Sequence, residues 1–111
     1  MTYDRFEKTP VWIAGQELGV DVFALVEDPA FDRKGDLHDQ LQRAVLSASN
    51  SIAEGFERGT TEDLIWFLYI ARGSAGEVRN ALLFADRLVE RKILRSQISD
   101  LKSQISNLIP R

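Results

Sequence analysis

Apolar residues recur with a seven-residue period over residues 64–89, and this pattern restricts the fold of the chain more than any other feature. The apolar positions follow one another in steps of four and three residues: Leu64, Leu68, Ala71, Ala75, Val78, Leu82, Ala85 and Val89. Such spacing forms one apolar seam along a helix, as in helical bundles and coiled coils. No segment of the sequence shows the apolar–polar alternation of a half-buried strand. The pattern therefore predicts an all-α chain with a long helix over residues 62–90.

Three further helices are predicted from their end signals and apolar spacing. They span residues 10–27, 36–57 and 96–109. Thr9 and Pro10 form an N-cap and a first helical residue, and Asp36 is the expected N-cap of the helix that follows. Residues 1–8 are polar, and we expect them to be flexible. Four helices joined by short loops within residues 9–109 predict one up-down-up-down four-helix bundle.

The helix predicted at 62–90 carries a second group of residues on the side opposite its seam. This group is Trp66, Tyr69, Ile70, Gly73, Asn80 and Phe84. A helix with two apolar faces is either central in its domain or shared with another chain. No helix is central in a single four-helix bundle, so this second face predicts an oligomer interface.

The helix predicted at 36–57 has a polar stripe that consists of Arg43, Ser47, Asn50 and Glu54. Serine and asparagine are mediocre residues for the middle of a helix, so their position in a row indicates a contact. Three interpretations remain open: a solvated face, hydrogen bonds within or between subunits, and an anion site at Arg43. We favour the second, and expect Arg43, Asn50 and Glu54 to be largely buried and hydrogen-bonded in the oligomer.

These residues also carry a resemblance to a known family. The matching segments are Gln42-Arg43-Ala44-Val45, Ser47, Asn50 with Ile52-Ala53-Glu54-Gly55, Arg58, then Phe67-Leu68, Ile70-Ala71, Gly73-Ser74 and Glu77, and near the N-terminus Val11-Trp12. They resemble the motifs of the 23S rRNA-intervening-sequence proteins, a family of four-helix bundles. The polar residues of the motifs are Arg43, Ser47, Asn50, Glu54, Arg58, Ser74 and Glu77. Ser51 separates Asn50 from Ile52, whereas the common spelling of the family has these two residues adjacent.

The resemblance implies a fold and a type of function. Members of this family form closed homopentamers with a central channel, so we expect a ring of four-helix bundles that acts as a structural or interaction scaffold. The accessory protein of diversity-generating retroelements is similar and binds nucleic acid beside a reverse transcriptase. A nucleic-acid-binding accessory protein, for RNA or DNA, is therefore the alternative function.

Charge is distributed unevenly along the chain, whose net charge is −3. Residues 1–63 carry six basic and thirteen acidic side chains, whereas residues 87–111 carry six basic and two acidic ones. The cations nearest to the end of the 62–90 helix are Arg87, Arg91, Lys92 and Arg95. They suit the negative end of that helix dipole, and the alternative interpretation is a phosphate-binding patch.

The sequence offers no converging catalytic or metal-binding groups. It contains no cysteine and a single histidine, His38, and it lacks the Glu-x-x-His pairs of di-iron bundles. We therefore expect no enzymatic activity, no cofactor and no metal. No apolar stretch is long enough to cross a membrane and no signal peptide is apparent, so the expected location is the cytoplasm.

Overall fold

Every secondary-structure element of the described chain is helical. A computed structural model describes the backbone of residues 3–32 and 34–108, and the side-chain surroundings of residues 3–32, 34–89, 102–105 and 107. The elements are the α-helices α1 (Pro10–Leu25), α2 (Gly35–Glu57) and α3 (Thr61–Leu108), and the 3₁₀ helices η1 (Phe6–Lys8) and η2 (Pro29–Phe31). The all-α prediction is confirmed for this part of the chain. The chain divides into two compact units, Met1–Ala81 and Leu82–Arg111.

Short polar side chains set the helix starts that the sequence predicts. The Thr9 hydroxyl accepts a hydrogen bond from the Trp12 backbone N–H at 3.3 Å, and Pro10 is the first residue of α1. The Thr60 hydroxyl accepts one from the Asp63 N–H at 3.2 Å, directly before α3. Each bond satisfies one of the N–H groups that a helix start leaves without an intrahelical partner. Gly59, with φ of 83°, follows the end of α2 in the left-handed conformation that glycine tolerates best.

The structure adds detail at the N-terminal sides of two predicted elements. Within the segment expected to be flexible, Phe6–Lys8 forms η1, and the Phe6 ring packs 5.6 Å from the ring of Trp12 and 6.5 Å from that of Phe56. Such aromatic contacts hold the segment against the helices. The second helix begins at Gly35 rather than after Asp36, and Lys34 precedes it without a side-chain cap. Asp36 instead lies in the first turn, where its carboxylate suits the helix dipole.

The predicted break between a third and a fourth helix is wrong. α3 is helical without interruption from Thr61 to Leu108, so the backbone continues through residues 91–95. The sequence of this segment, Arg-Lys-Ile-Leu-Arg, contains neither glycine nor proline. Arginine, lysine and leucine are all good helix formers, so nothing local stops the helix.

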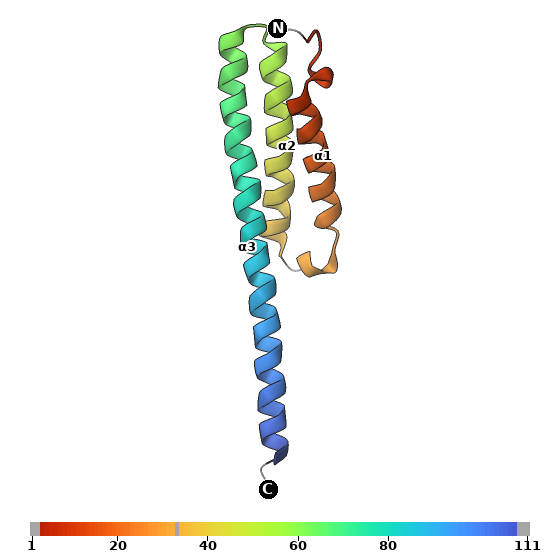
Figure 1. Ribbon diagram of the computed structural model, residues 1–111, viewed down its shortest axis with the longest axis vertical. Coiled ribbons are helices and arrows are strands. Elements are labelled where there is room, and N and C mark those ends of the chain that lie inside the picture. The colour runs from red at the N-terminus through yellow and green to blue at the C-terminus, as the bar shows by residue number, and fades with distance from the viewer. Residues whose placement is uncertain (1–2, 33, 109–111) are drawn as a thin grey trace. The chain divides into compact units, whose positions relative to one another are not determined.

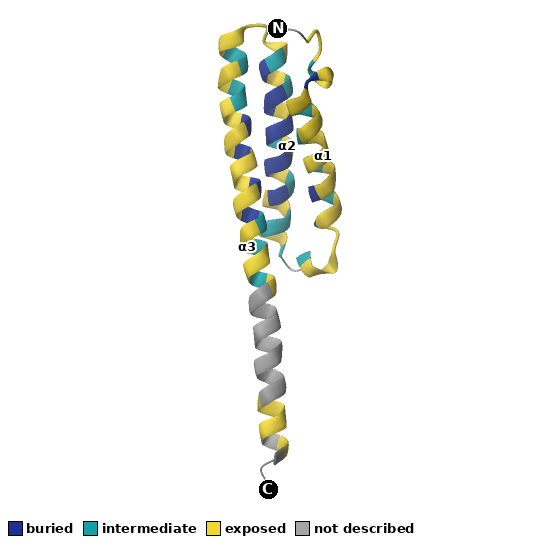
Figure 2. Ribbon diagram, in the orientation of Figure 1, coloured by how far each residue is buried: buried dark blue, intermediate teal, exposed yellow. Residues whose placement is uncertain are grey.

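The core of the first unit lies along α2, which is positioned between α1 and the first part of α3 (Figure 1). Figure 2 shows that the buried residues concentrate on α2 and on the side of α3 that faces it. On α2 they are Leu41, Ala44, Val45, Ala48, Ser49, Ser51, Ile52 and Gly55. Leu41 on α2 and Val78 on α3 are the largest fully buried side chains of this core. The apolar side of α2 that the sequence predicts is therefore the centre of the core.

Burial on α3 is centred differently from the predicted seam. Ala71, Ser74, Val78 and Ala81 are buried, whereas Ala75 is exposed and Leu68 is half-buried. The buried line thus contacts α2, and Leu68 and Ala75 face to one side of this contact. Their side of α3 borders an open groove that is described below.

α2 and α3 approach each other closely at Gly55. A β-carbon at this position would lie 2.5 Å from Cβ of Phe67 and 3.5 Å from Cα of Leu64. The sequence suggests only that Gly55 helps to end its helix, but the residue is buried inside α2. Its lack of a side chain permits the contact between the two helices.

Candidate functional site

The polar stripe of α2 is divided between an interhelical contact and solvent. The hydroxyl groups of Ser47 and Ser74 are hydrogen-bonded at 3.0 Å, which joins α2 to α3. Arg43, Asn50 and Glu54 are exposed in the single chain. Hydrogen bonds within the subunit are therefore present for Ser47, across the two helices, and for Glu54, with Arg58 at the end of the same helix. Burial of Arg43, Asn50 and Glu54 in an oligomer stays a prediction.

The remaining polar residues of the family motifs also lie at or near the contact of α2 with α3. Glu54 forms an ion pair with Arg58 at 3.2 Å, and the Arg58 guanidinium lies 5.1 Å from the centre of the Phe67 ring. Glu77 accepts a long hydrogen bond of 3.5 Å from Gln40. These exposed pairs contribute little stability individually. Together with Ser47 and Ser74 they line one edge of the interhelical contact.

An apolar groove opens on the other edge of this contact, where α1, α2 and α3 surround it. We call it the three-helix groove. It has a cavity volume of about 370 Å³, and its lining residues are Val11, Ala14, Gly15, Leu18, Ala48, Ile52, Leu68, Ala71, Arg72 and Ala75. Arg72 is the only charged residue in this lining. Such a surface is apolar enough to pack against another helix.

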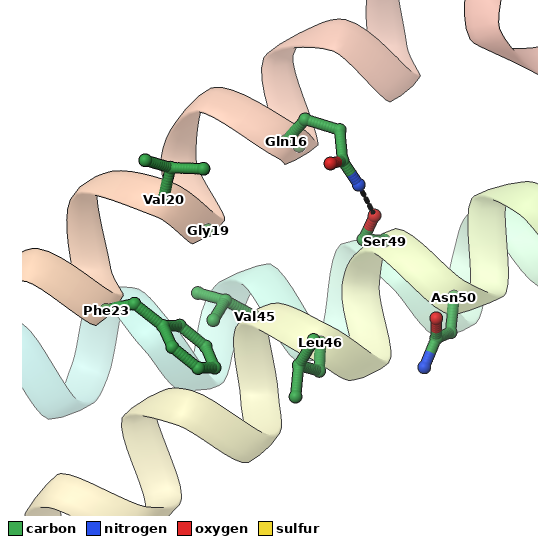
Figure 3. A pocket seen from close by; sticks show the side chains of 9 residues that line it. Gln16, Gly19, Val20, Phe23, Val45, Leu46, Ser49 and Asn50 are labelled. Carbon is green, nitrogen blue, oxygen red and sulfur yellow. Dashed lines mark hydrogen bonds between the residues drawn. The ribbon is translucent and has the colours of Figure 1, made fainter.

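A second pocket lies between α1 and α2 (Figure 3). We call it the α1–α2 pocket; its volume is about 340 Å³, and it is lined by Gly15, Gln16, Gly19, Val20, Phe23, Val45, Leu46, Ser49 and Asn50. Val45 and Phe23 are largely covered, whereas Val20 and Leu46 are half-exposed or more. A β-carbon on Gly19 would meet no atom within 4 Å. Gly15 and Gly19, four residues apart, have no side chains and therefore leave space beside α1 at this point.

The α1–α2 pocket has one polar end. The Gln16 side-chain Nε2 donates a hydrogen bond of 2.6 Å to the hydroxyl of Ser49 (Figure 3). Asn50 lies on the same side and is exposed. The pocket thus combines apolar walls with amide and hydroxyl groups at its rim, a combination found in sites for side chains and small ligands.

The predicted interface residues of α3 are all exposed. Trp66 and Tyr69 have exposed fractions of 64% and 65%, and Ile70, Gly73 and Asn80 are exposed in the same unit. Phe84, in the second unit, has an exposed fraction of 60%. Within the described residues, no atom lies within 4 Å of a β-carbon placed on Gly73. Among the described residues, nothing therefore packs closely against Gly73.

Comparison with known families identifies the chain. A family model described as 23S rRNA-intervening sequence protein matches residues 7–110. The chain belongs to the 23S rRNA-intervening sequence protein family. No curated protein sequence and no solved structure shows a significant match to it. The match covers both compact units, so it includes the motifs on α2 and α3 and the basic segment that follows them.

In this family member the basic cluster lies on the second unit. Arg87 is exposed, whereas the side chains of Arg91, Lys92 and Arg95 fall outside the described residues. The backbone is helical through all four positions. Positions 87, 91 and 95 are therefore spaced by four residues along one continuous helix.

The described residues contain no group of three histidine, cysteine, aspartate or glutamate side chains that could hold a metal ion. His38 is partly exposed, and its Nδ1 lies 3.0 Å from Oδ1 of Asp39. Within the same residues, no helix has both the length and the apolar character that a membrane span requires. The described residues thus offer three surfaces for binding: the three-helix groove, the α1–α2 pocket and the aromatic face of α3.

Sequence reasoning found the aromatic face but missed the α1–α2 pocket. Its signal is present, since Gly15 and Gly19 stand one turn apart inside a helix. Each glycine in a helix interior costs about 1 kcal/mol relative to alanine. Two of them at this spacing indicate a helix surface with unfilled space beside it, as the pocket lining shows.

Proposed function

We propose that this family member is a non-enzymatic, oligomeric scaffold, an up-down-up-down four-helix bundle that assembles into a ring of five copies. The observation that supports the proposal is the extent of apolar surface that the first unit leaves open. Monomeric soluble proteins rarely expose contiguous apolar patches of more than a few hundred Å². The three-helix groove and the aromatic face of α3 both require cover.

The fourth helix of the bundle is the proposed cover of the three-helix groove. Residues 96–108 repeat a seven-residue motif, with apolar residues at Ile98, Leu101, Ile105 and Leu108. A helix of about 13 residues is marginal in water and needs an apolar surface to pack on. Ile105 has an exposed fraction of 57% in the described chain, which leaves it available for such packing. Since α3 is continuous through residues 91–95, the segment that completes the bundle would be the same segment of a neighbouring copy.

The aromatic face of α3 supports assembly beyond a single bundle. Trp66 and Tyr69 are exposed to nearly the same degree, on a helix that also presents Ile70. Aromatic residues are enriched at protein–protein interfaces, where they supply most of the binding energy. The face is therefore the proposed contact between subunits.

We expect light scattering to give a mass well above that of the 12.6 kDa chain at micromolar concentration, with five times the chain mass as the proposed value. Burial of the aromatic face and of neighbouring apolar residues drives this association. The measurement should be repeated in high salt, which screens surface charges but not apolar contacts. A monomer mass under both conditions would contradict the scaffold proposal.

A nucleic-acid-binding accessory protein is the second candidate. The observation that favours it is the continuity of α3, which spaces Arg87, Arg91 and Arg95 one turn apart. The acidic character of residues 1–63 opposes binding elsewhere in the chain, because nucleic-acid sites need a basic footprint. A ring would repeat the cluster once per subunit and raise avidity without new contacts.

If this candidate is correct, binding of RNA or DNA should fall steeply with salt and depend little on base sequence. About four neutralised phosphates per cluster predict a slope near −3 to −4 for log affinity against log salt. Arg91→Glu combined with Arg95→Glu should abolish binding and preserve helical content. The measurement is a salt titration of fluorescent single- and double-stranded RNA and DNA. Lack of binding by the unmodified protein at low salt would remove this candidate.

A further inference from the structure

The α1–α2 pocket and the aromatic face of α3 are complementary surfaces on the same chain. We propose that the α1–α2 pocket of one copy receives Trp66 of a second copy, with Tyr69 packed beside it. This inference rests on the proposed assembly and specifies which surfaces meet in it. Each copy would then contribute one pocket and one inserted indole to the ring.

Size and shape are the first argument. The pocket has a volume of about 340 Å³ and walls formed by Val20, Phe23 and Leu46, which suits one large aromatic side chain. Trp66 is the largest side chain with an exposed fraction above one half in the described residues. Residues that dominate protein interfaces are typically tryptophan, tyrosine and arginine that enter desolvated pockets.

Hydrogen-bonding capacity is the second argument. Gln16 uses its Nε2 to donate to Ser49, so its Oε1 is directed elsewhere as an acceptor. An indole has one N–H donor, and a buried tryptophan usually finds an acceptor for it. Gln16 lies at the polar end of an otherwise apolar pocket. The arrangement matches an indole, which is apolar except for its single N–H.

Charge complementarity is the third argument and favours a second copy over an unrelated partner. Glu17 and Asp21 adjoin the pocket, because they form a shallow surface depression with its lining residues Gln16 and Val20. On α3, Arg72 and Tyr69 together line a shallow surface depression, and Arg72 also borders the three-helix groove. Insertion of Trp66 would thus bring an arginine toward two carboxylates. Such pairing orients partners and disfavours other registers.

The geometry of the contact agrees with a ring. The pocket lies on α1 and α2, whereas Trp66 and Tyr69 lie on α3, so the two surfaces are different patches of one subunit. A contact between different patches is heterologous, and repetition of a heterologous contact yields a closed ring or an open filament. A two-fold dimer would instead bury the same patch on both copies.

The first test is a substitution on α1 whose new side chain occupies the α1–α2 pocket. Gly19→Leu places a side chain in the α1–α2 pocket, where a β-carbon meets no atom within 4 Å, and it replaces glycine by a better helix former. We expect the variant to keep its helical content but to associate at least about 30-fold more weakly, as for loss of an interface hot spot. Gly35→Leu is the matched control, since Gly35 is equally unhindered and does not line the pocket. It should assemble as the unmodified protein does.

A mixing experiment distinguishes this contact from other modes of assembly. Trp66→Ala combined with Tyr69→Ala removes the inserted side chains but leaves the pocket open. Mixed with Gly19→Leu, it should form a one-to-one complex, because each variant retains the half that the other has lost. Light scattering or sedimentation of the separate and mixed variants gives the masses.

The outcomes separate this inference from the scaffold proposal. A monomeric unmodified protein would overturn both. Assembly of the unmodified protein together with undiminished assembly of Gly19→Leu would overturn only the pocket contact. Failure of the two variants to form a one-to-one complex on mixing would likewise overturn the pocket contact.

Discussion

Replacement of Gly55 by valine should destabilise the protein by about 3 kcal/mol or more. A β-carbon at this position would lie 2.5 Å from Cβ of Phe67, closer than such atoms approach in folded proteins. The valine methyl groups extend further toward α3, where the Leu64 backbone is also near. The two helices must separate to admit them, which loosens the core along α2. Thermal unfolding followed by circular dichroism should show a melting temperature lower by about 10 °C or more.

Two companion variants make this result specific. Gly19→Ala adds a β-carbon in open space, so it should stabilise the protein by about 0.5–1 kcal/mol through helix propensity. Phe67→Ala retains the β-carbon that Gly55 faces, so adding it to Gly55→Val should not restore stability. All variants need the same protein concentration, because assembly makes melting temperatures concentration-dependent. Equal melting temperatures for Gly55→Val and the unmodified protein would contradict the close contact between α2 and α3.

Replacement of Leu41 by alanine should have the other large effect, a loss of about 3–5 kcal/mol. Leu41 has no exposed surface and lies on the α2 stripe that forms the centre of the core. Its truncation removes buried apolar surface and leaves a cavity, and both terms destabilise the folded state. Urea unfolding should show a lower midpoint with an unchanged slope.

Leu25→Ala is the matched control for this substitution. Leu25 lies at the end of α1 with an exposed fraction of 42%, so the same chemical change should cost about 1 kcal/mol or less. If Leu25→Ala were as damaging as Leu41→Ala, the core would not be centred on α2 as described.

Glycine residues matter at three places in this family member: the contact of α2 with α3, the α1–α2 pocket and the aromatic face of α3. Gly55 lets α2 contact α3, Gly15 and Gly19 hollow the α1–α2 pocket, and Gly73 leaves open space on the aromatic face. The structure explains Gly55 by a contact inside the chain. For Gly19, the proposed neighbour is the Trp66 side chain of a second copy.

Local sequence signals determined the helical class, the positions of α1 and α2, and the start of α3. Thr9, Pro10, Thr60 and Gly59 act through hydrogen bonds or backbone angles within a few residues, so their effect is visible without any tertiary structure. The apolar stripe of α2 was predictable for a similar reason, since a helix of known period turns spacing into a face. The family motifs lie on these same segments.

Tertiary structure alone decided which apolar positions are covered and which remain open. The seam predicted on α3 includes Leu68 and Ala75, but both border the three-helix groove, because burial depends on which neighbour is present and not on periodicity. Gly55 and Gly19 are the same residue type in similar helices, yet one is enclosed and the other faces a pocket. Sequence spacing fixes the direction in which a residue projects from its own helix, whereas the distance to the next helix depends on how the whole chain packs.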